Sequence, residues 1–223
     1  MNEVEWVFEL PGHARALFTT RAAGNLSSVR GAGRAHAGDA RTALGERLGV
    51  SRIARGRQVH GAVVARVDRD PDEGELTEAD GQATSRSDVA LMVLTADCLP
   101  VVLAGHNAVA VVHAGWRGIV AGVLEEGVHA LRELGCREEI AAVVGPGAGA
   151  CCYEVGAEVH AALGATARKA TIDLQQVARS RLNAAGVRDV TAVPACTICD
   201  ERFFSHRREG RMAGRQGGVA WRG

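Results

Sequence analysis

The sequence predicts an α+β fold of mixed α/β layers, with mixed β-sheets flanked by helices. Short apolar runs typical of strands alternate along the chain with segments whose apolar residues recur every three or four positions, as in amphipathic helices. Two of these runs, residues 99–103 and 108–112, are separated by four residues with the composition of a hairpin loop. Hairpins combined with helical crossovers favour such a layered fold.

Length and composition favour one soluble domain over residues 1–223. Of the 223 residues 47% are apolar, which is enough for a substantial core, and no Pro- or Ser-rich linker divides the chain. The formal net charge is zero, which argues against a nucleic-acid partner. The acidic N-terminus is unlike a signal peptide, and no apolar run approaches the roughly eighteen residues that a membrane span needs. We therefore expect a cytoplasmic monomer with neither nucleic-acid nor membrane partners.

The first third of the chain contains one early strand and one weak helix. Residues 17–21 have the composition of a strand, and residues 39–48 have weak helical character. Between them, residues 24–38 are rich in glycine and alanine and have little potential to form core. We expect this loop to be a lid or a disordered tip.

The next segment leads into the hairpin. Residues 62–67 are rich in valine and predict a strand, so that His60 comes at its start. The acidic residues 68–78 predict a solvated loop that ends in a turn at residues 79–81. Residues 89–94 predict a buried strand that feeds the hairpin.

The second half contains the clearest helix. Its apolar positions are Val120, Leu124, Val128, Leu131 and Leu134, and Gly135 follows as a stop. Two further helices are expected around residues 155–163 and 174–182, with strands at residues 140–144 and 187–193.

The hairpin brings a thiol and an imidazole together. If Leu103 faces Ala108, antiparallel pairing places Cys98 opposite His113, with Cβ atoms roughly 4.5–5.5 Å apart. The two side chains could share a metal ion, or His113 could activate Cys98 as a nucleophile. The hairpin geometry leaves both interpretations open.

His60 is the best candidate for a third ligand. His60, Cys98 and His113 plus one water would make an open, catalytic metal site. Asp97 points to the opposite strand face and is a poor ligand candidate. Asp80 could orient a ligand histidine, although an Asx turn is the simpler interpretation.

Two segments could bind anions. Residues 113–118 run from a strand into a helix N-terminus, where Arg117 could complete a phosphate site, or where Gly115 and Gly118 simply permit a tight turn. Residues 202–215 contain five arginines beside two phenylalanines, which favours a structured contact with an anionic or aromatic substrate. The candidate contacts in this segment are Phe203 or Phe204, His206, Arg207, Arg208 and Arg215.

The remaining cysteines give no metal motif. Cys196 and Cys199 form one CxxC pair, but a second CxxC is missing, and the adjacent Cys151 and Cys152 cannot supply it. We interpret these four, and Cys136, as incidental thiols in a reducing compartment.

Several short motifs occur together from residue 57 onward. They are Gln58-Val-His-Gly61, Ala79-Asp-Gly81, Thr95-Ala-Asp-Cys-Leu-Pro100, His113-Ala-Gly-Trp-Arg-Gly118, Gly145-Pro146, Cys152-Tyr-Glu-Val155, Phe204-Ser-His-Arg-Arg208 and Gly214-Arg215. With this combination the sequence resembles the YfiH or laccase-domain family, also called multicopper polyphenol oxidases and now regarded as purine nucleoside phosphorylases. Relatives carry a longer N-terminal glycine-rich loop and a downstream Asn-Arg pair, which is absent here.

The resemblance implies a YfiH-like fold and a zinc site, with copper as the other candidate ion. It implies that His60, Cys98 and His113 are the ligands. It also implies phosphorolysis of adenosine, inosine and methylthioadenosine, with adenosine deamination as a second activity. We expect phosphate held by Arg117 and the arginine segment to attack the ribose C1′, and zinc to activate water for deamination.

Three other functions remain compatible with the residues. A Cys-His amidase or peptidoglycan-editing hydrolase could use Cys98 and His113 as nucleophile and base. A copper polyphenol oxidase is suggested by the older family name, but one set of three ligands is far short of the roughly ten histidines of a multicopper laccase. A non-catalytic interaction module would leave the convergent ligands without a purpose.

Overall fold

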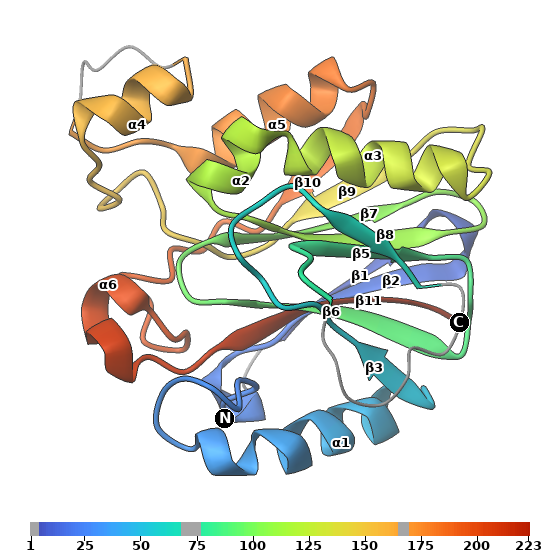
Figure 1. The fold of residues 1–223 in the computed structure, drawn as a ribbon, viewed down its shortest axis with the longest axis horizontal. Helices are drawn as coiled ribbons and strands as arrows, with labels where there is room; N and C mark the ends of the chain where they lie inside the picture. The colour runs from blue at the N-terminus through green and yellow to red at the C-terminus, as the bar shows by residue number, and fades with distance from the viewer. Residues whose placement is uncertain (1–4, 68–76, 165–169) are drawn as a thin grey trace.

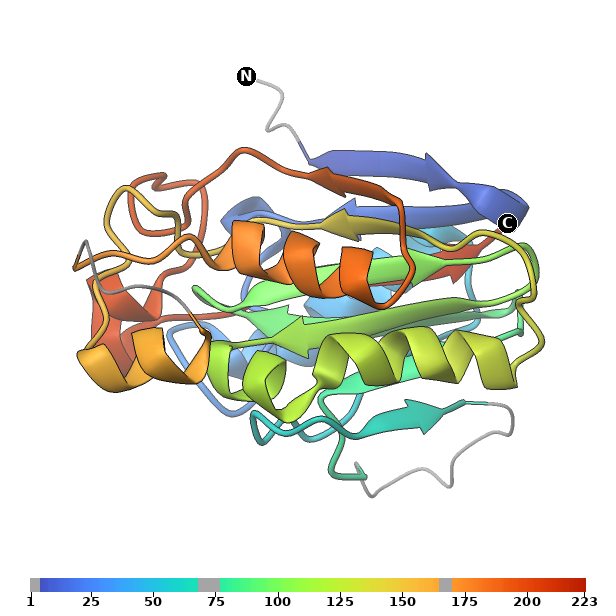
Figure 2. The same cartoon turned by 90° about the horizontal axis from the view of Figure 1, so that it is seen from above.

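Two β-sheets stack face to face, and helices cover both outer faces (Figures 1 and 2). The computed structural model describes residues 5–67, 77–164 and 170–223. Its layers run helix, sheet, sheet, helix, which confirms the mixed α/β fold class. Within the described ranges, no helix is both long and apolar enough to span a membrane.

The first sheet has five strands and mixed pairing. Across the sheet they are β1 (Trp6–Leu10), β2 (Ala14–Phe18), β11 (Gln216–Arg222), β6 (Val89–Thr95) and β3 (Arg52–Ala54). Helix α1 (Ala37–Leu48) covers its outer face, where Leu44 packs with Met92 and Trp221.

The second sheet has six strands and carries most of the helices. Across the sheet they are β10 (Asp189–Ala192), β9 (Ala141–Val144), β7 (Leu99–Ala104), β8 (Val109–Ala114), β5 (Gly81–Thr84) and β4 (Val64–Arg66). The helices beyond α1 are α2 (Trp116–Ala121), α3 (Val123–Glu133), α4 (Ala157–Ala162), α5 (Leu174–Ala184) and α6 (His206–Glu209). Figure 2 shows α2, α3 and α5 lying across the outer face of this sheet.

The hairpin β7–β8 is buried on both faces. Val102 and Val111 pack between the sheets, whereas Val101, Leu103 and Val112 pack towards the helices. Strand side chains alternate between faces, so burial on both sides requires apolar residues at successive positions. This requirement explains the continuous apolar runs in the sequence.

The predicted register of the hairpin is wrong by two residues. Leu103 pairs with Ala110, and Pro100, rather than Cys98, lies opposite His113. The turn occupies residues 105–108 and is closed by the Gly105 N–H, which donates to the carbonyl of Ala108 at 3.0 Å. Because the shift is an even number of residues, every side chain of the hairpin keeps its face.

Two other expectations are also wrong. The helix predicted over residues 120–134 is divided at Gly122, whose φ of 93° ends α2 and begins α3. The loop at residues 24–38 is packed rather than a disordered tip, since Leu26 is fully buried and the Asn25 side chain donates to the carbonyls of Arg30 and Ala32 at 2.6 and 3.0 Å. A lid function for this loop stays a prediction.

Four strands were not predicted from the sequence. They are β1, β3, β5 and β11. The turn predicted at residues 79–81 leads directly into β5, which is only four residues long. Strand β11 contains two glycines and still lies in the centre of its sheet. Of the predicted acidic loop at residues 68–78, residues 68–76 lie outside the described residues.

The centre of the fold tolerates no side chain at Gly218 of β11. A Cβ atom there would overlap the Cβ atom of Pro100 in the facing sheet. We expect Gly218→Ala to lower the free energy of unfolding by about 1–3 kcal/mol, the usual cost of overpacking. Chemical denaturation measures the change.

Gly38→Ala in α1 is the matched control, because a Cβ atom there meets nothing within 4 Å. This substitution should be neutral or stabilise the protein by up to about 1 kcal/mol, from helix propensity. Equal stability of the two variants would contradict the close packing of the sheets.

Candidate metal and substrate site

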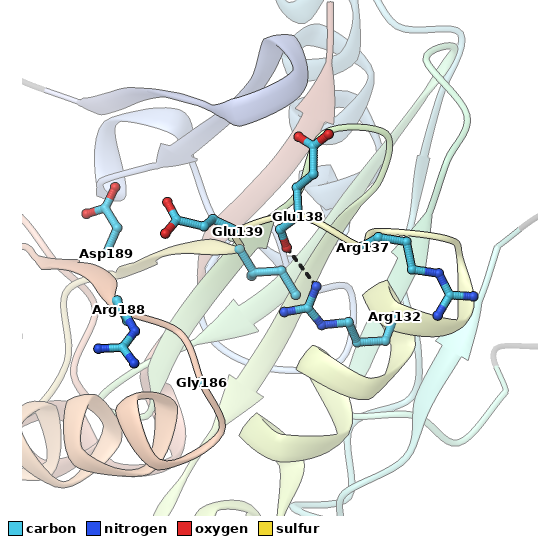
Figure 3. A pocket seen from close by; sticks show the side chains of 8 residues that line it. Arg132, Arg137, Glu138, Glu139, Gly186, Arg188 and Asp189 are labelled. Carbon is cyan, nitrogen blue, oxygen red and sulfur yellow. Dashed lines mark hydrogen bonds between the residues drawn. The ribbon is translucent and has the colours of Figure 1, made fainter.

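Two pockets lie away from the predicted ligands. One of about 330 Å³ lies at the far end of α3 and is lined by Arg132, Arg137, Glu138, Glu139, Ile140, Gly186, Arg188 and Asp189. Figure 3 shows acidic and basic side chains interspersed around it, and Arg132 donates to the carbonyls of Cys136 and Glu138, both at 2.7 Å. A second pocket, of about 530 Å³, lies between β4 and α3. Neither contains a nucleophile or a convergent ligand set, so we place the candidate site at the predicted triad.

Asp80 organises the triad. Its buried carboxylate accepts the backbone N–H groups of Val59, His60 and Gly61 at 3.0, 2.9 and 2.8 Å, and contacts Nδ1 of His113 at 2.8 Å. Burial acts to raise the pKa of Asp80, but these hydrogen bonds outweigh it and lower the pKa. Asp80 therefore orients His113, and the expected Asx turn is wrong, because the carboxylate accepts N–H groups from the distant residues 59–61.

The prediction that His60 lies at the start of a strand is wrong, because His60 lies in the loop before β4. Its backbone has a φ of 64°, a conformation that is uncommon outside glycine. The three N–H groups held by Asp80 fix this conformation. The imidazole of His60 is exposed and lies edge-on to that of His113, with ring centroids 4.8 Å apart.

The three predicted ligands converge. The ligand atoms of His60, Cys98 and His113 all lie within 4.8 Å of one another. Burial acts to raise the pKa of Cys98, but His113 and His60 more than offset this and lower it to about 6. Burial acts to lower the pKa of His113, but Cys98 and Asp80 raise it to about 9. In the metal-free protein Cys98 and His113 therefore form a thiolate–imidazolium pair at neutral pH.

Glycine at position 115 makes room for the triad. A Cβ atom at Gly115 would lie 2.9 Å from the sulfur of Cys98 and 3.2 Å from the His60 ring. The helix that follows, α2, has six residues, and Arg117 is exposed with its guanidinium over the Trp116 ring at 4.2 Å. Arg117 thus lies one turn from the triad on a short helix.

The triad residues fit a metal ion. Two imidazoles and a thiol with a lowered pKa are the donor types that zinc prefers, and three of them leave an open position. Nδ1 of His113 is engaged by Asp80, which leaves Nε2 of this histidine to coordinate the metal ion. This arrangement is common around metal-binding histidines.

Asp97 connects the triad to the C-terminal segment. Its φ is 89°, and its carboxylate accepts the Thr197 hydroxyl and the backbone N–H of Arg207, both at 2.7 Å. Asp97 is therefore not a ligand but holds Cys98 against two distant loops.

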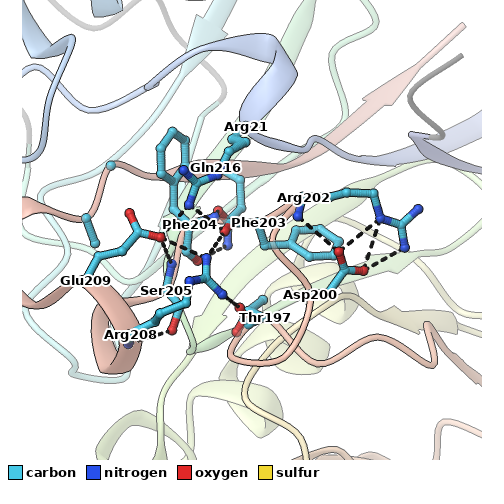
Figure 4. A network of polar contacts seen from close by, with 12 residues as sticks. Arg21, Thr197, Asp200, Arg202, Phe203, Phe204, Ser205, Arg208, Glu209 and Gln216 are labelled. Carbon is cyan, nitrogen blue, oxygen red and sulfur yellow. Dashed lines mark hydrogen bonds and ion pairs between the residues drawn. The ribbon is translucent and has the colours of Figure 1, made fainter. Parts of the chain in front are cut away.

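The predicted arginine segment is a folded structure (Figure 4). Arg208 donates to the carbonyls of Thr197, Ile198 and Phe203 and to the carboxylate of Glu209, which also binds Arg21. These bonds engage both Nη groups of Arg208, so this guanidinium holds the segment together.

The aromatic residues of this segment have different environments. Phe203 is fully buried and stacks on Trp6 with ring centroids 5.5 Å apart, which makes it a core residue. Phe204 is partly buried, and the guanidinium of Arg21 lies 4.6 Å from its ring centroid. His206 is exposed, and its Nδ1 contacts the carbonyl of Gly210 at 2.9 Å, which leaves Nε2 accessible.

One arginine of this segment contacts Tyr153. Arg207 lies over the Tyr153 ring at 4.9 Å and donates to the carbonyl of Glu154 at 2.8 Å. Burial and the nearby Cys98 raise the pKa of Tyr153, while Arg207 opposes them. Tyr153 is part of one of the motifs, but nothing in the sequence indicated that it would lie within electrostatic reach of Cys98.

The N-terminal loop supports Arg215. The backbone N–H of Arg215 donates to the side chain of Asn25 at 2.9 Å, and its Nη1 donates to the carbonyls of Ala213 and Gly214. Burial and Arg30 lower the pKa of Arg215, whereas Cys98 and Asp97 act in the opposite direction. Arg215 therefore lies within electrostatic reach of the triad.

The four cysteines interpreted as incidental form a second cluster. The sulfur atoms of Cys151, Cys152, Cys196 and Cys199 all lie within 4.8 Å of one another. The prediction failed because neighbouring side chains point apart only in an extended chain, whereas residues 149–152 form a turn. Cys136 is buried elsewhere and contacts Asn107.

Comparison with known proteins gives consistent matches. The family model described as multi-copper polyphenol oxidoreductase laccase matches residues 13–223. A purine nucleoside phosphorylase of Xylella fastidiosa strain Temecula1 is 42% identical and aligns over 96% of this chain and 89% of its own. One from Corynebacterium glutamicum is 33% identical, over 93% and 94% of the two chains.

Solved structures agree with these matches. Protein NMB0706 of Neisseria meningitidis superposes with a TM-score of 0.86 at 28% identity, covering 98% of this chain and 99% of its own. YlmD from Geobacillus stearothermophilus superposes with a TM-score of 0.85 at 29% identity, covering 94% and 92%.

The thiolate of Cys98 can be tested by alkylation. In protein stripped of metal, we expect iodoacetamide to label Cys98 half-maximally at a pH of about 6 and faster above it, because only the thiolate reacts. His113→Gln should move this midpoint upwards, towards the ordinary value of 9.0. Mass spectrometry of the digested protein measures the labelling of each cysteine.

Buried Cys136 provides the control in the same digest, since its labelling would report unfolding. A midpoint near 9 in the wild-type protein would show that the two imidazoles do not stabilise the thiolate.

Proposed function

The chain belongs to the multi-copper polyphenol oxidoreductase laccase family, which confirms the resemblance drawn from its motifs, and on this premise we propose that it is a zinc-dependent purine nucleoside phosphorylase. Its substrates would be adenosine, inosine or methylthioadenosine together with phosphate, and adenosine deamination would be a second activity. The observation that carries the proposal is a three-ligand metal set beside a rim of guanidinium groups. The phosphorylase names of relatives at 42% and 33% identity support it.

In this proposal His60, Cys98 and His113 hold the ion and Asp80 positions them. When bound there, zinc supplies an activated water for hydrolytic deamination of adenosine. Asp80 keeps His113 in the tautomer whose Nε2 is free, and it fixes the loop that carries His60. Copper remains the other candidate ion.

In phosphorolysis, phosphate attacks C1′ of the ribose, so phosphate and nucleoside must bind side by side. Arg117, Arg207 and Arg215 are the candidates for binding phosphate, because each has guanidinium nitrogens with no hydrogen bond among the described residues. Their positive charges would bind the phosphate dianion and hold it against C1′ while the glycosidic C–N bond breaks and the purine departs. Tyr153, Phe204 and the exposed Nε2 of His206 are candidates for contacts with the nucleoside.

A Cys-His hydrolase is the second candidate function. The observation that favours it is the Cys98 thiolate paired with the His113 imidazolium, which is the state of an activated nucleophile. A copper polyphenol oxidase is less well supported, because the triad offers ligands for a single ion.

Metal analysis combined with a phosphate-dependence assay separates these functions. Protein purified without added metal should contain zinc and should release ribose 1-phosphate from adenosine only when phosphate is present. Cys98→Ala should lose about one zinc ion per chain and at least about 100-fold in turnover, because an open site with two ligands binds zinc weakly. Formation of inosine without phosphate measures the deaminase activity.

Cys136→Ser is the matched control and should keep both zinc and turnover. A metal-free enzyme that iodoacetamide inactivates would support the hydrolase instead. Full metal content and full turnover in Cys98→Ala would rule out the zinc proposal.

The role of Arg117 can be tested separately. We expect Arg117→Met to raise the KM for phosphate by roughly 10- to 100-fold, the value of one charge-assisted hydrogen bond, with a smaller change in the KM for adenosine. Arg211→Met is the matched control, because Arg211 is exposed like Arg117, lies on the arginine-rich segment 202–215 and has no hydrogen bond among the described residues. Equal kinetics of the two variants would remove Arg117 from the phosphate site.

A further inference from the structure

Two turns that are distant in sequence bring four thiols together. The Cys152 N–H donates to the carbonyl of Gly149 at 3.2 Å and closes the first turn, and the Asp200 N–H donates to the carbonyl of Cys196 at 2.9 Å and closes the second. The shortest sulfur–sulfur distance is 3.1 Å, between Cys152 and Cys199. The pairs Cys151–Cys199 and Cys152–Cys196 are both 3.4 Å apart, and Cys151–Cys152 is 3.5 Å apart.

We propose that Cys151, Cys152, Cys196 and Cys199 form a structural tetrathiolate zinc site, separate from the triad. Zn–S bonds of about 2.3 Å in a tetrahedron place the sulfur atoms about 3.8 Å apart. The observed separations of 3.1–3.5 Å are slightly shorter, so that small outward movements of the side chains would seat the ion. Four protein ligands leave no open position, which is typical of a structural zinc site.

The surroundings of Cys196 favour its thiolate. The Gly149 N–H donates to the Cys196 sulfur at 3.1 Å. A Cβ atom at Gly149 would lie 2.9 Å from Cys196 Cβ and 3.3 Å from the sulfur of Cys151, so the absence of a side chain lets the turns approach. Such N–H···S bonds are common around zinc-bound thiolates.

Positive charge also lies beside the cluster. Arg208 donates to the carbonyls of Thr197 and Ile198, the two residues between Cys196 and Cys199, at 2.8 and 2.9 Å. A tetrathiolate zinc centre carries a net charge of about −2, which this guanidinium would partly compensate.

An ion at this position would connect the two loops that contain Tyr153 and Thr197. Tyr153 follows Cys152 directly and holds Arg207, while Thr197 follows Cys196 directly and donates to Asp97 beside Cys98. The zinc would therefore fix the loops around the candidate substrate site without contacting substrate. This inference does not depend on the nucleoside chemistry.

Zinc content in a background without the triad tests the proposal. The full-length His60→Ala/Cys98→Ala variant, purified from zinc-containing medium, should keep about one zinc ion per chain. Adding Cys196→Ser and Cys199→Ser should remove that ion, whereas adding Cys136→Ser should not. A triad-free variant without zinc, or with iron in its place, would overturn the proposal.

Cobalt substitution of the wild-type protein gives a reading that does not depend on the folding of variants. The four thiolates of the cluster should add strong sulfur-to-cobalt charge-transfer absorption, about four times that of the single Cys98 thiolate. Absorption corresponding to the one thiolate of Cys98 would overturn the proposal. An intact mass lower by two hydrogen atoms per bridge, showing disulfides in this cluster in freshly purified protein, would overturn it as well.

Discussion

The candidate site depends on the carboxylate of Asp80, which is completely buried at the entrance to β5. A buried carboxylate is costly unless its oxygen atoms are satisfied, and here three successive N–H groups and one imidazole satisfy them. The same bonds hold the strained backbone of His60 and orient His113 on β8. One charge therefore links three parts of the chain, and removing it would disturb both histidines at once.

The rest of the site is assembled by the loops at one end of the six-stranded sheet. Strands β7 and β8 are rigid and buried, and the triad residues Cys98 and His113 lie where β7 begins and β8 ends. Asp97 then attaches this end to the turn that contains Thr197 and to the start of α6. The chemistry thus lies on a rigid scaffold, while the cationic rim comes from Arg117 on α2 and from Arg207 and Arg215, which contact Tyr153 and Asn25 respectively.

Strong local patterns in the sequence were sufficient to predict the buried strands and the residues of the triad. They were not sufficient to predict the strand register or the cysteine cluster, which depend on tertiary contacts. Apolar runs identified β6, β7, β8 and β9, and the side chains of Cys98 and His113 converge although the predicted register is wrong, because the shift was even. Strands β3 and β5 are too short to show alternation, and β11 contains two glycines that local propensity disfavours. The cysteine cluster was missed because it depends on two turns whose approach no spacing rule describes.

The position of β11 has a consequence for how the protein folds. This strand pairs with β2 on one side and with β6 on the other, so that Trp221 lies opposite Arg15. Until β11 inserts, both neighbours expose open edges whose backbone groups could pair with another chain. Contacts between residues so far apart in sequence carry a large loop-closure cost and slow folding. Completion of the five-stranded sheet is therefore a late event, and the growing chain is most prone to aggregation shortly before it.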